Sequence, residues 1–580
     1  MPSVNIDWNA IDNAKPVLER FPSRRSVVFG RKGLIASSQP LACAAGIEIL
    51  AKGGNAMDAA VATSMALNVT EPSCCGIGGD AFALFWDAKT KKVHAMNGSG
   101  RSPKALDAVK LQEKGMKGRN IPFTDLNAVT VPGAPAAWVD SVEKYGSGKV
   151  TFADVAAPAI RLAEEGVPVS EINSIQWVHS EQLIKNASPD ANAMLLNGKA
   201  PLPGQVMRFP DLAETFRTLV REGKDGFYQG RIADAIVELI KAKGGYMELE
   251  DLASHKTEIV EPISYIYAND VRLYECPPNG QGITALLALG ILEAAQEEGK
   301  IRPLLEMEHN SPEYLHALVE ALRLAFADSL HWVTDPDVMT VSAEKILSKD
   351  YIKARAKYFN PHQALRDIHH GDPVNSSDTV YFTVTDQWGN AASYIQSNYA
   401  GFGTGAIPKA CGFTLQNRGC GFVIDDLDHP NVLKGGKRPY HTIIPAIATR
   451  GDELFMSFGV MGGYMQPQGH IQVLLNMLRG WNPQDSLDAP RFCISPANTD
   501  TRGPNDSNDD ISIVYVEPGI SPETIQSLKD MGHVVRPVVG VQRALMGRGQ
   551  IIQQLRTTNE ELVWAAGSDP RADGQAVPQI

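Results

Sequence analysis

Polar and apolar residues alternate strictly over 379–385, a segment that begins with Thr379. Four residues that carry a hydroxyl group alternate there with three apolar residues. This period of two predicts a strand with one buried face and a threonine at its first position. The segment 387–390 is turn-like, so the run 391–397 is predicted to return as the second strand of a hairpin.

The register of this hairpin would bring two hydroxyl groups together. If the turn is centred on Trp388, Thr379 lies directly opposite Ser397. Facing residues of an antiparallel pair have Cβ atoms roughly 4.5–5.5 Å apart, which allows a hydrogen bond between their hydroxyl groups. A strand-opening threonine can also become an N-terminal nucleophile. Thr379 is therefore the first candidate for a catalytic residue, and Ser397 is its predicted partner.

Other patterns predict helices and loops. Ala and Leu recur at helical spacing over 41–67, and the interruption at 52–55 predicts a helix, a glycine C-cap and a second helix. Ser311 is the expected N-cap of a long amphipathic helix that reaches about residue 330. Residues 1–36 are expected to form a loosely structured leader. Residues 361–378, rich in Pro, Gly, Asn and Ser, predict a loop.

Composition is that of a soluble globular protein: 580 residues, of which 43% are apolar and 21% charged. Length alone suggests about three or four domains. The formal net charge is -12 and the pI about 5.6, and no basic run is interleaved with aromatic residues. These features exclude nucleic acid as an expected partner.

The chain shows no sign of export or of a membrane span. Residues 1–22 carry charges and prolines throughout and contain no apolar stretch approaching 18 residues, so a cytoplasmic location is expected. Seven cysteines are an odd number without a CxxC pair. They are predicted to be reduced and mostly buried.

Several glycine-rich and proline-rich motifs follow one another along the chain. They are Gly53–Val61, Glu71–Gly79, Val131–Gly133, Gly226–Gly230, Pro277–Gly282, Glu320–Asp328, Thr379–Thr385, Ser397–Gly405, Lys437–Pro439 and Gly462–Gly463. The number and the order of these motifs make the sequence resemble the gamma-glutamyltranspeptidase family of N-terminal nucleophile hydrolases. The resemblance covers nearly the whole chain from about residue 37.

The resemblance implies an α+β fold, the four-layer αββα sandwich, in which helices cover two stacked antiparallel sheets. It also implies a proenzyme that cuts itself between Asp378 and Thr379. After a leader of residues 1–36, a large subunit of residues 37–378 and a small subunit of residues 379–580 would form one αββα unit. Whether two such pairs associate is left open.

In this family the new N-terminal threonine supplies both nucleophile and base. Its α-amino group has an unperturbed pKa of about 7.7 to 8.0, so part of it is neutral at pH 7. The resemblance makes Thr379 the nucleophile, places Ser397 where a family threonine bonds that nucleophile, and makes Gly462 and Gly463 the oxyanion donors. No metal or cofactor is expected, because no ligand cluster or phosphate-binding lysine motif is apparent.

The predicted substrate pocket departs from that of the best-known family members. An arginine, Arg101, stands two residues rather than four before its proline, and the segment 422–437 is too short for a lid. Gly421 stands where those members have an acidic residue. The remaining predicted contacts replace an asparagine, a glutamine-like residue and a pair of serines; they are Tyr399, Arg418, His441 and Thr442.

These changes resemble a lidless branch that includes oxamate amidohydrolase and glutathione hydrolase-like proenzymes. Losing an acidic partner for a substrate ammonium group removes a contact of roughly 1.5 to 3 kcal/mol. Arg418 is then an expected anion receptor; a structural ion pair with Asp425 or Asp426 is the alternative. The resemblance therefore implies an autoprocessing threonine amidohydrolase or acyltransferase. The expected substrate is a small anionic amide, either a gamma-glutamyl amide of the glutathione type or an oxamate-like acid. A cephalosporin-acylase-like activity and an unprocessed, inactive binding protein are the other hypotheses.

Overall fold

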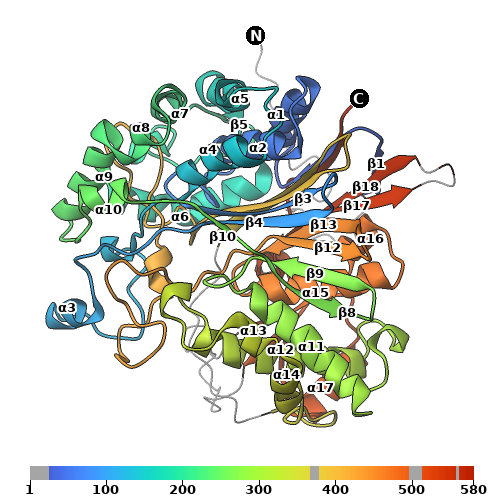
Figure 1. Cartoon of the computed structure of the whole chain (residues 1–580). Coiled ribbons are helices and arrows are strands. Elements are labelled where there is room, and N and C mark those ends of the chain that lie inside the picture. Colours follow the sequence, from blue (N-terminus) through green and yellow to red (C-terminus); the bar gives the residue numbers. More distant parts are fainter. Residues whose placement is uncertain (1–24, 366–377, 496–511, 557–558, 560) are drawn as a thin grey trace, which may run out of the picture.

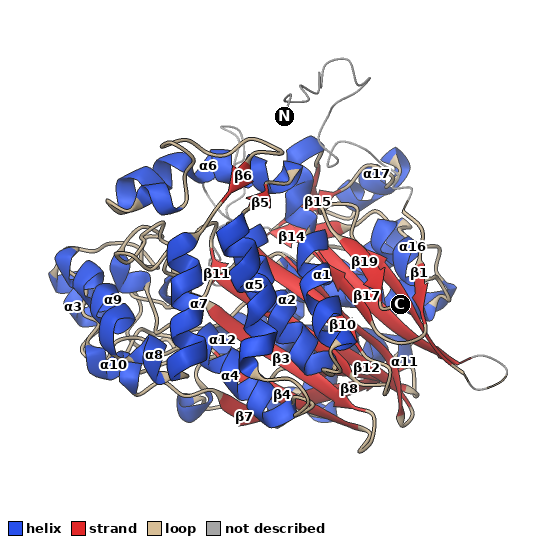
Figure 2. Ribbon diagram, turned by 90° about the horizontal axis from the view of Figure 1, so that it is seen from above, coloured by secondary structure: helices blue, strands red, loops and turns tan. Residues whose placement is uncertain are grey.

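The structure, a computed structural model, describes residues 25–365, 378–495, 512–556, 559 and 561–580 (Figure 1). Two seven-stranded antiparallel sheets lie face to face in its centre, and helices cover the outer face of each sheet (Figures 1 and 2). The layers therefore follow the order helix, sheet, sheet, helix. This is the αββα sandwich, an α+β fold, that the resemblance implied.

The two large sheets draw strands from both sides of residue 378. Sheet 1 contains, in spatial order, β19 (Gln575–Pro578), β2 (Leu34–Ser37), β10 (Asp378–Thr385), β11 (Ala391–Tyr399), β3 (Asp80–Asp87), β4 (Lys92–Gly98) and β7 (Glu258–Val260). Sheet 2 contains β1 (Val28–Gly30), β18 (Leu562–Ser568), β17 (Arg548–Arg556), β13 (Glu453–Met461), β12 (Ala446–Arg450), β9 (Val271–Glu275) and β8 (Ile263–Tyr267).

Two helical layers and two small sheets complete the described part of the chain. Over sheet 1 lie α1 (Pro40–Ala51), α2 (Ala56–Thr70), α4 (Ala134–Tyr145), α5 (Phe152–Glu165) and α7 (Pro210–Glu222), and over sheet 2 lie α11 (Gly282–Glu297), α12 (Pro312–Trp332), α15 (Met465–Leu478) and α16 (Pro483–Asp488). Other helices are α3 (Ala108–Glu113), α6 (Glu171–Ala187), α8 (Asp225–Tyr228), α9 (Gly230–Ala242), α10 (Leu249–Ala253), α13 (Ala343–Ile346), α14 (Lys349–Ala356) and α17 (Pro522–Asp530). The small sheets are formed by β14 (Phe492–Ser495), β15 (Ile513–Val516) and β16 (Val534–Pro537), and by β5 (Val167–Pro168) and β6 (Val206–Met207).

Three apolar cores lie between the four layers. Phe382 of β10 packs against the helices over sheet 1. Tyr381 belongs to the core between the two sheets, and Phe458 of β13 belongs to the core under α11, α12 and α15. Both faces of β10 are therefore buried, which corrects the expectation of a single buried face. The polar face can be buried because its hydroxyl groups find partners, as in the Thr383–Ser457 hydrogen bond of 2.6 Å.

The local predictions for the hairpin and the helices are confirmed. The turn after β10 is held by Asp386, whose Oδ1 accepts from the backbone amides of Trp388 and Asn390. Gly53, with φ of 95°, ends α1, and Asn55 caps α2 through hydrogen bonds to two backbone amides. Ser311 caps α12 as expected.

The expected leader needs correction. Its boundary at residue 36 falls inside β2, whose Leu34, Ile35 and Ala36 are fully buried, and β1 lies at the edge of sheet 2. These strands are too short for their alternation to stand out in the sequence. Residues 1–24 lie outside the described residues, as do 366–377 of the loop expected over 361–378.

All seven cysteines are free and buried, as predicted. None of the helices in the described part of the chain combines the length and apolar character that a membrane span requires.

Candidate active site

The hairpin brings the two predicted hydroxyl groups together. Thr379 Oγ1 donates a hydrogen bond of 3.1 Å to Ser397 Oγ, which also accepts from the Tyr399 amide at 2.8 Å. From Val380 onward the register is the predicted one, and an irregularity before Val380 pairs Asp378 with Tyr399. Thr379 and Ser397 are both fully buried. The hydroxyl contact inferred from the sequence is therefore present.

The glycine turn lies at the same end of the sandwich. The hydroxyl-bearing face of β10 packs on β13, where Thr383 meets Ser457 and the Tyr381 ring covers Gly459. β10 and β13 therefore run in opposite directions where they pack, and Arg548 contacts both Thr379, near the start of β10, and Met461, where β13 ends. Gly462 and Gly463 follow directly.

Gly462 and Gly463 form a tight turn between β13 and α15. Their φ values are 132° and 58°, a region that side chains rarely adopt. A Cβ atom on Gly462 would lie 3.0 Å from the Gly547 Cα atom. The carbonyl of Gly463 accepts from Gln281 Nε2 at 2.8 Å, which fixes the turn from the other side. Two successive backbone amides in such a turn can act as oxyanion donors.

Arg548 joins the glycine turn to Thr379, and the sequence analysis missed it. It opens β17, pairs with Met461, and donates from Nη2 to the Thr379 carbonyl at 3.5 Å. Its Nη1 forms an ion pair of 2.5 Å with Glu71. Glu71 lies in the Glu71–Gly79 motif, and glycines flank Arg548 on both sides. That glycine-flanked arginine is the signal that could have drawn attention to it.

A cavity of about 270 Å³ is lined by the end of β11, by the residue that follows the glycine turn, and by residues from the segments 119–123 and 420–440. Tyr399 follows the Ser397 contact, and Tyr464 follows the glycine turn, so the cavity opens beside both. Its lining is largely aromatic and amide in character: Arg119, Asn120, Ile121, Pro122, Phe123, Leu330, Tyr399, Cys420, Gly421, Val423, His429, Asn431, Tyr440 and Tyr464.

Arg418 is buried beside this cavity. Its Nη1 donates to Thr442 Oγ1 at 2.7 Å, whereas Nε and Nη2 find no partner among the described residues. Burial lowers the pKa of the guanidinium to about 10, so it stays charged at neutral pH. Within the part of the chain that the structure describes, Arg418 has no ion pair with Asp425 or Asp426, and Asp425 pairs with Arg119 at 3.6 Å. A buried cation with unused donors is suited to hold an anion.

His441 does not offer a ring nitrogen to the pocket. Its Nε2 contacts Asp80 Oδ2 at 3.0 Å, and the Ile443 amide donates to Nδ1 at 3.4 Å. Burial lowers the pKa of His441 to about 3, so the ring is neutral and Nε2 donates to the carboxylate. The other Asp80 oxygen accepts from the amides of Gly100 and Gly133. His441 therefore anchors a buried carboxylate that the sequence analysis also missed.

Arg101 is engaged by carboxylates of its own chain. It pairs with Asp335 at 2.5 Å, with Asp337 at 2.9 Å and with Glu258 at 3.5 Å. It also donates to the Gly436 carbonyl at 3.1 Å. These contacts give Arg101 structural partners, and its binding of substrate stays a prediction.

One buried group among the described residues has the composition of a metal site: His316, Glu320 and His533. His316 Nδ1 lies 2.7 Å from His533 Nε2, and His316 Nε2 donates to the Asn360 carbonyl at 2.8 Å. Arg323 bonds both Glu320 and the remaining His533 nitrogen. Every ring nitrogen is thus satisfied, and a cation already neutralises the carboxylate. The group fits a hydrogen-bonded structural cluster better than a divalent metal.

Comparison with known proteins gives a consistent result. The family model described as Gamma-glutamyltranspeptidase matches residues 42–579. A Bacillus subtilis glutathione hydrolase-like YwrD proenzyme is 37% identical over 95% of this chain and 99% of its own length. An oxamate amidohydrolase proenzyme of Klebsiella pneumoniae is 29% identical, over 94% of this chain and 98% of its own length.

A solved structure agrees over the same range. The crystal structure of a cephalosporin acylase from Bacillus halodurans is 40% identical, with a TM-score of 0.85, over 97% of this chain and 99% of that one. The relatives are enzymes, and the sandwich is that of the N-terminal nucleophile hydrolases. The chain belongs to the gamma-glutamyltranspeptidase family.

Proposed function

We propose that this enzyme is an autoprocessing threonine amidohydrolase that acts on a small anionic amide. Cleavage between Asp378 and Thr379 would release a large subunit that ends at Asp378 and a small subunit of residues 379–580. The 3.1 Å hydrogen bond between the Thr379 and Ser397 hydroxyl groups carries the proposal. It supports Thr379 as the nucleophile because the pair stands at the head of a strand beside a Gly-Gly turn, in a chain of this family.

The proposed reaction passes through an ester on Thr379. The α-amino group of Thr379 takes the proton of Oγ1, and Oγ1 attacks the substrate carbonyl carbon. The amides of Gly462 and Gly463 stabilise the oxyanion, and the leaving amine departs with the proton held by the α-amino group. Water, or an acceptor amine, then attacks the ester by the same route and releases the acyl group.

The contacts of Arg418 support an acyl group that carries a carboxylate. Two of its guanidinium nitrogens find no partner among the described residues, and the Thr442 hydroxyl holds a third. Gly421 leaves no carboxylate at the position where an ammonium group would be bound. An oxamate-like or dicarboxylic half-amide therefore fits better than a gamma-glutamyl amide, which is the second candidate substrate.

A cephalosporin-acylase-like activity is a further candidate, favoured by the likeness to the Bacillus halodurans enzyme and by the aromatic lining of the cavity. An unprocessed binding protein is the hypothesis from another class. The hydrogen-bonded Thr379–Ser397 pair weighs against it.

The decisive experiment follows cleavage and activity together. Purified protein is expected to give two chains on a denaturing gel, the smaller beginning at Thr379 by N-terminal sequencing. Thr379→Ala should remain one chain without amidase activity, and Thr379→Ser should cleave more slowly. Thr383→Val, four residues further along the same face, is the matched control and should cleave normally. A different N-terminus, or activity in Thr379→Ala, would refute the assignment.

A further inference from the structure

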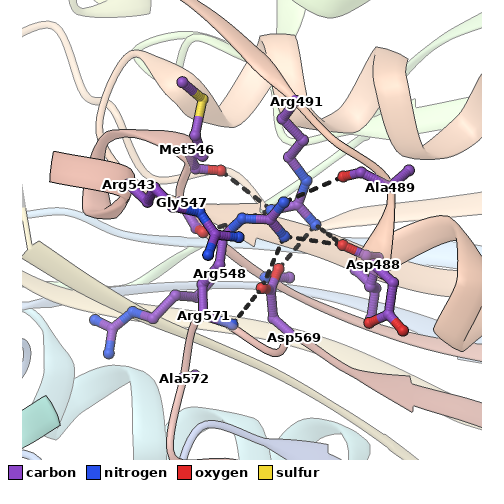
Figure 3. Close-up of polar contacts among 12 residues, drawn as sticks. Asp488, Ala489, Arg491, Arg543, Met546, Gly547, Arg548, Asp569, Arg571 and Ala572 are labelled. Carbon is purple, nitrogen blue, oxygen red and sulfur yellow. Dashed lines mark hydrogen bonds and ion pairs between the residues drawn. The ribbon is translucent and has the colours of Figure 1, made fainter. Parts of the chain in front are cut away.

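The backbone around Arg548 is held rigidly between the glycine turn and a buried ionic cluster. A Cβ atom on Gly547 would overlap the Met461 carbonyl, so the 546–548 backbone lies directly against the end of β13. Arg491 donates to the Met546 and Gly547 carbonyls at 3.1 and 3.4 Å, and it pairs with Asp569 at 2.8 Å. Figure 3 shows Gly547 and Arg548 beside Arg491. The base of the Arg548 side chain is therefore fixed.

The tip of Arg548 reaches across to sheet 1. Nη2 donates to the Thr379 carbonyl at 3.5 Å and to Cys74 Sγ at 3.2 Å, and Nε contacts Met461 Sδ at 3.4 Å. Nη1 holds Glu71, whose other oxygen accepts from Ser38. The guanidinium is thus oriented by contacts on several sides, and one of them is the backbone of the proposed nucleophile.

These contacts restrict the direction of the Thr379 α-amino group. Its Cα atom carries four substituents, and the structure fixes two of them: Ser397 bonds the side-chain hydroxyl, and Arg548 bonds the carbonyl. Because the Cα atom is tetrahedral, the positions of its side chain and its carbonyl group determine the direction of its nitrogen. Covalent geometry keeps the nitrogen and carbonyl oxygen of one residue within roughly 3.6 Å of each other. The guanidinium therefore lies within about 7 Å of the nitrogen that cleavage would free.

The charges that face this nitrogen come from three elements. Arg548 supplies a positive charge from β17, and Glu71 supplies a negative charge from the turn after α2. Asp573 approaches from the segment before β19: burial raises the pKa of its carboxyl, with Glu71 adding to the rise and Arg548 opposing it. Cys74 contacts Arg548 at the same place. Within the Arg548–Glu71 pair, the cation is the partner that contacts Thr379.

We propose that Arg548 is a positioning residue for Thr379: it holds the carbonyl of that residue, so that the freed α-amino group points toward Oγ1 and stays unprotonated. The inference rests on the proposed function, because the amino group exists only after cleavage before Thr379. Arg548 acts through Thr379 and does not touch the substrate. Glu71 balances the positive charge of Arg548 and orients the second guanidinium nitrogen, Nη2, toward the Thr379 carbonyl.

The test measures kcat/KM against pH for cleaved enzyme, because the acid limb reports the protonation of the free base. Arg548→Met leaves the Glu71 carboxylate uncompensated near the amine, which favours the protonated amine. Its acid limb should move to higher pH by about one unit. Glu71→Gln leaves the guanidinium uncompensated and should move the limb to lower pH. Arg548→Lys keeps the charge and should leave the limb in place while kcat falls.

Arg323→Met is the matched control, because Arg323 also forms a buried ion pair, with Glu320 at 2.7 Å, far from the glycine turn in the chain. It should lower stability without moving the acid limb. Opposite shifts from the two partners of one ion pair are a signature that a purely structural role would not give. Unmoved limbs in both Arg548→Met and Glu71→Gln would overturn the proposal.

A variant that stays uncleaved is compared with uncleaved Thr379→Ala by thermal unfolding. An uncleaved Arg548→Met that unfolds at the same temperature as Thr379→Ala supports the positioning role, since the fold is intact and only the nucleophile is disabled. Unfolding well below that temperature contradicts it. These outcomes differ from failure of the proposed function, in which wild-type protein itself would show no chain beginning at Thr379.

Discussion

The guanidinium carbon of Arg418 lies 4.3 Å from the centre of the ring of Tyr399, a residue that lines the cavity. The ring covers one face of the cation, and Thr442 holds one edge. The remaining edge keeps unsatisfied donors among the described residues. A cation stacked in this way is fixed in direction, and its unsatisfied donors are suited to an anionic group of a ligand.

Arg418→Met should therefore raise KM for an anionic amide and change kcat less. A charge-assisted contact of roughly 1.5 to 3 kcal/mol corresponds to a change of about 10- to 150-fold in KM. Steady-state kinetics on a dicarboxylic half-amide would measure it. Arg450→Met, which breaks an exposed ion pair with Asp270 at the end of β12, is the control and should leave KM unchanged. Equal KM values for Arg418→Met and wild type would remove Arg418 from the pocket.

Gly462→Ala should disable the oxyanion turn. The alanine Cβ atom would lie 3.0 Å from the Gly547 Cα atom, and φ of 132° is strained for any side chain, so the turn must shift. Displacing one oxyanion donor is expected to lower kcat by about 10²–10³-fold. Gly480→Ala is the matched control, because Gly480 also has positive φ, of 86°, but has open space around it at the end of α15. It should lose stability and keep its kcat.

Stability should fall as the pH drops below neutrality. His441 and His533 are buried, and burial lowers their pKa values to about 3 and about 2. Between the ordinary pKa of about 6.5 and these values, the unfolded chain binds protons that the folded chain does not. The stability that the neutral histidines provide is complete above about pH 6.5 and is lost progressively toward pH 3. Asp328, whose pKa burial raises to about 6, offsets part of this loss.

Thermal unfolding of wild type at pH 7.5, 6.5 and 5.5 would show this as a falling midpoint. His533→Gln should unfold at a lower temperature throughout but with a smaller dependence on pH. A midpoint that stays constant over this range, together with an unchanged pH dependence in His533→Gln, would contradict the prediction.

Much of the architecture near Thr379 could be predicted from local pattern. Thr379 and Ser397 are joined by one short turn, so a register count was enough to place their hydroxyl groups together. The N-caps of α2 and α12 could be predicted equally well, because each depends on residues close in sequence.

Contacts between distant segments could not be read in this way. Arg548 meets Glu71 only because β17 and the turn after α2 approach from opposite sheets. Arg101 shows the same limit: its motif suggested a substrate contact and gave no sign of its ion pairs with Asp335 and Glu258. Partners separated by hundreds of residues leave no periodic signal, so the motif alone could not separate a binding arginine from a structural one.

The last prediction concerns the choice of substrate. Tyr399 and Gly421 stand where an ammonium group would otherwise be bound, and Arg418 supplies a cation nearby. A gamma-glutamyl donor brings an ammonium group toward that cation, which costs binding energy, whereas an oxamate-like acid brings only a carboxylate. We therefore expect a higher kcat/KM on oxamate or a dicarboxylic half-amide than on gamma-glutamyl-p-nitroanilide. If the gamma-glutamyl substrate is the best of the three and Arg418→Met does not change its KM, other groups must bind the ammonium, and a gamma-glutamyl hydrolase is then the correct assignment.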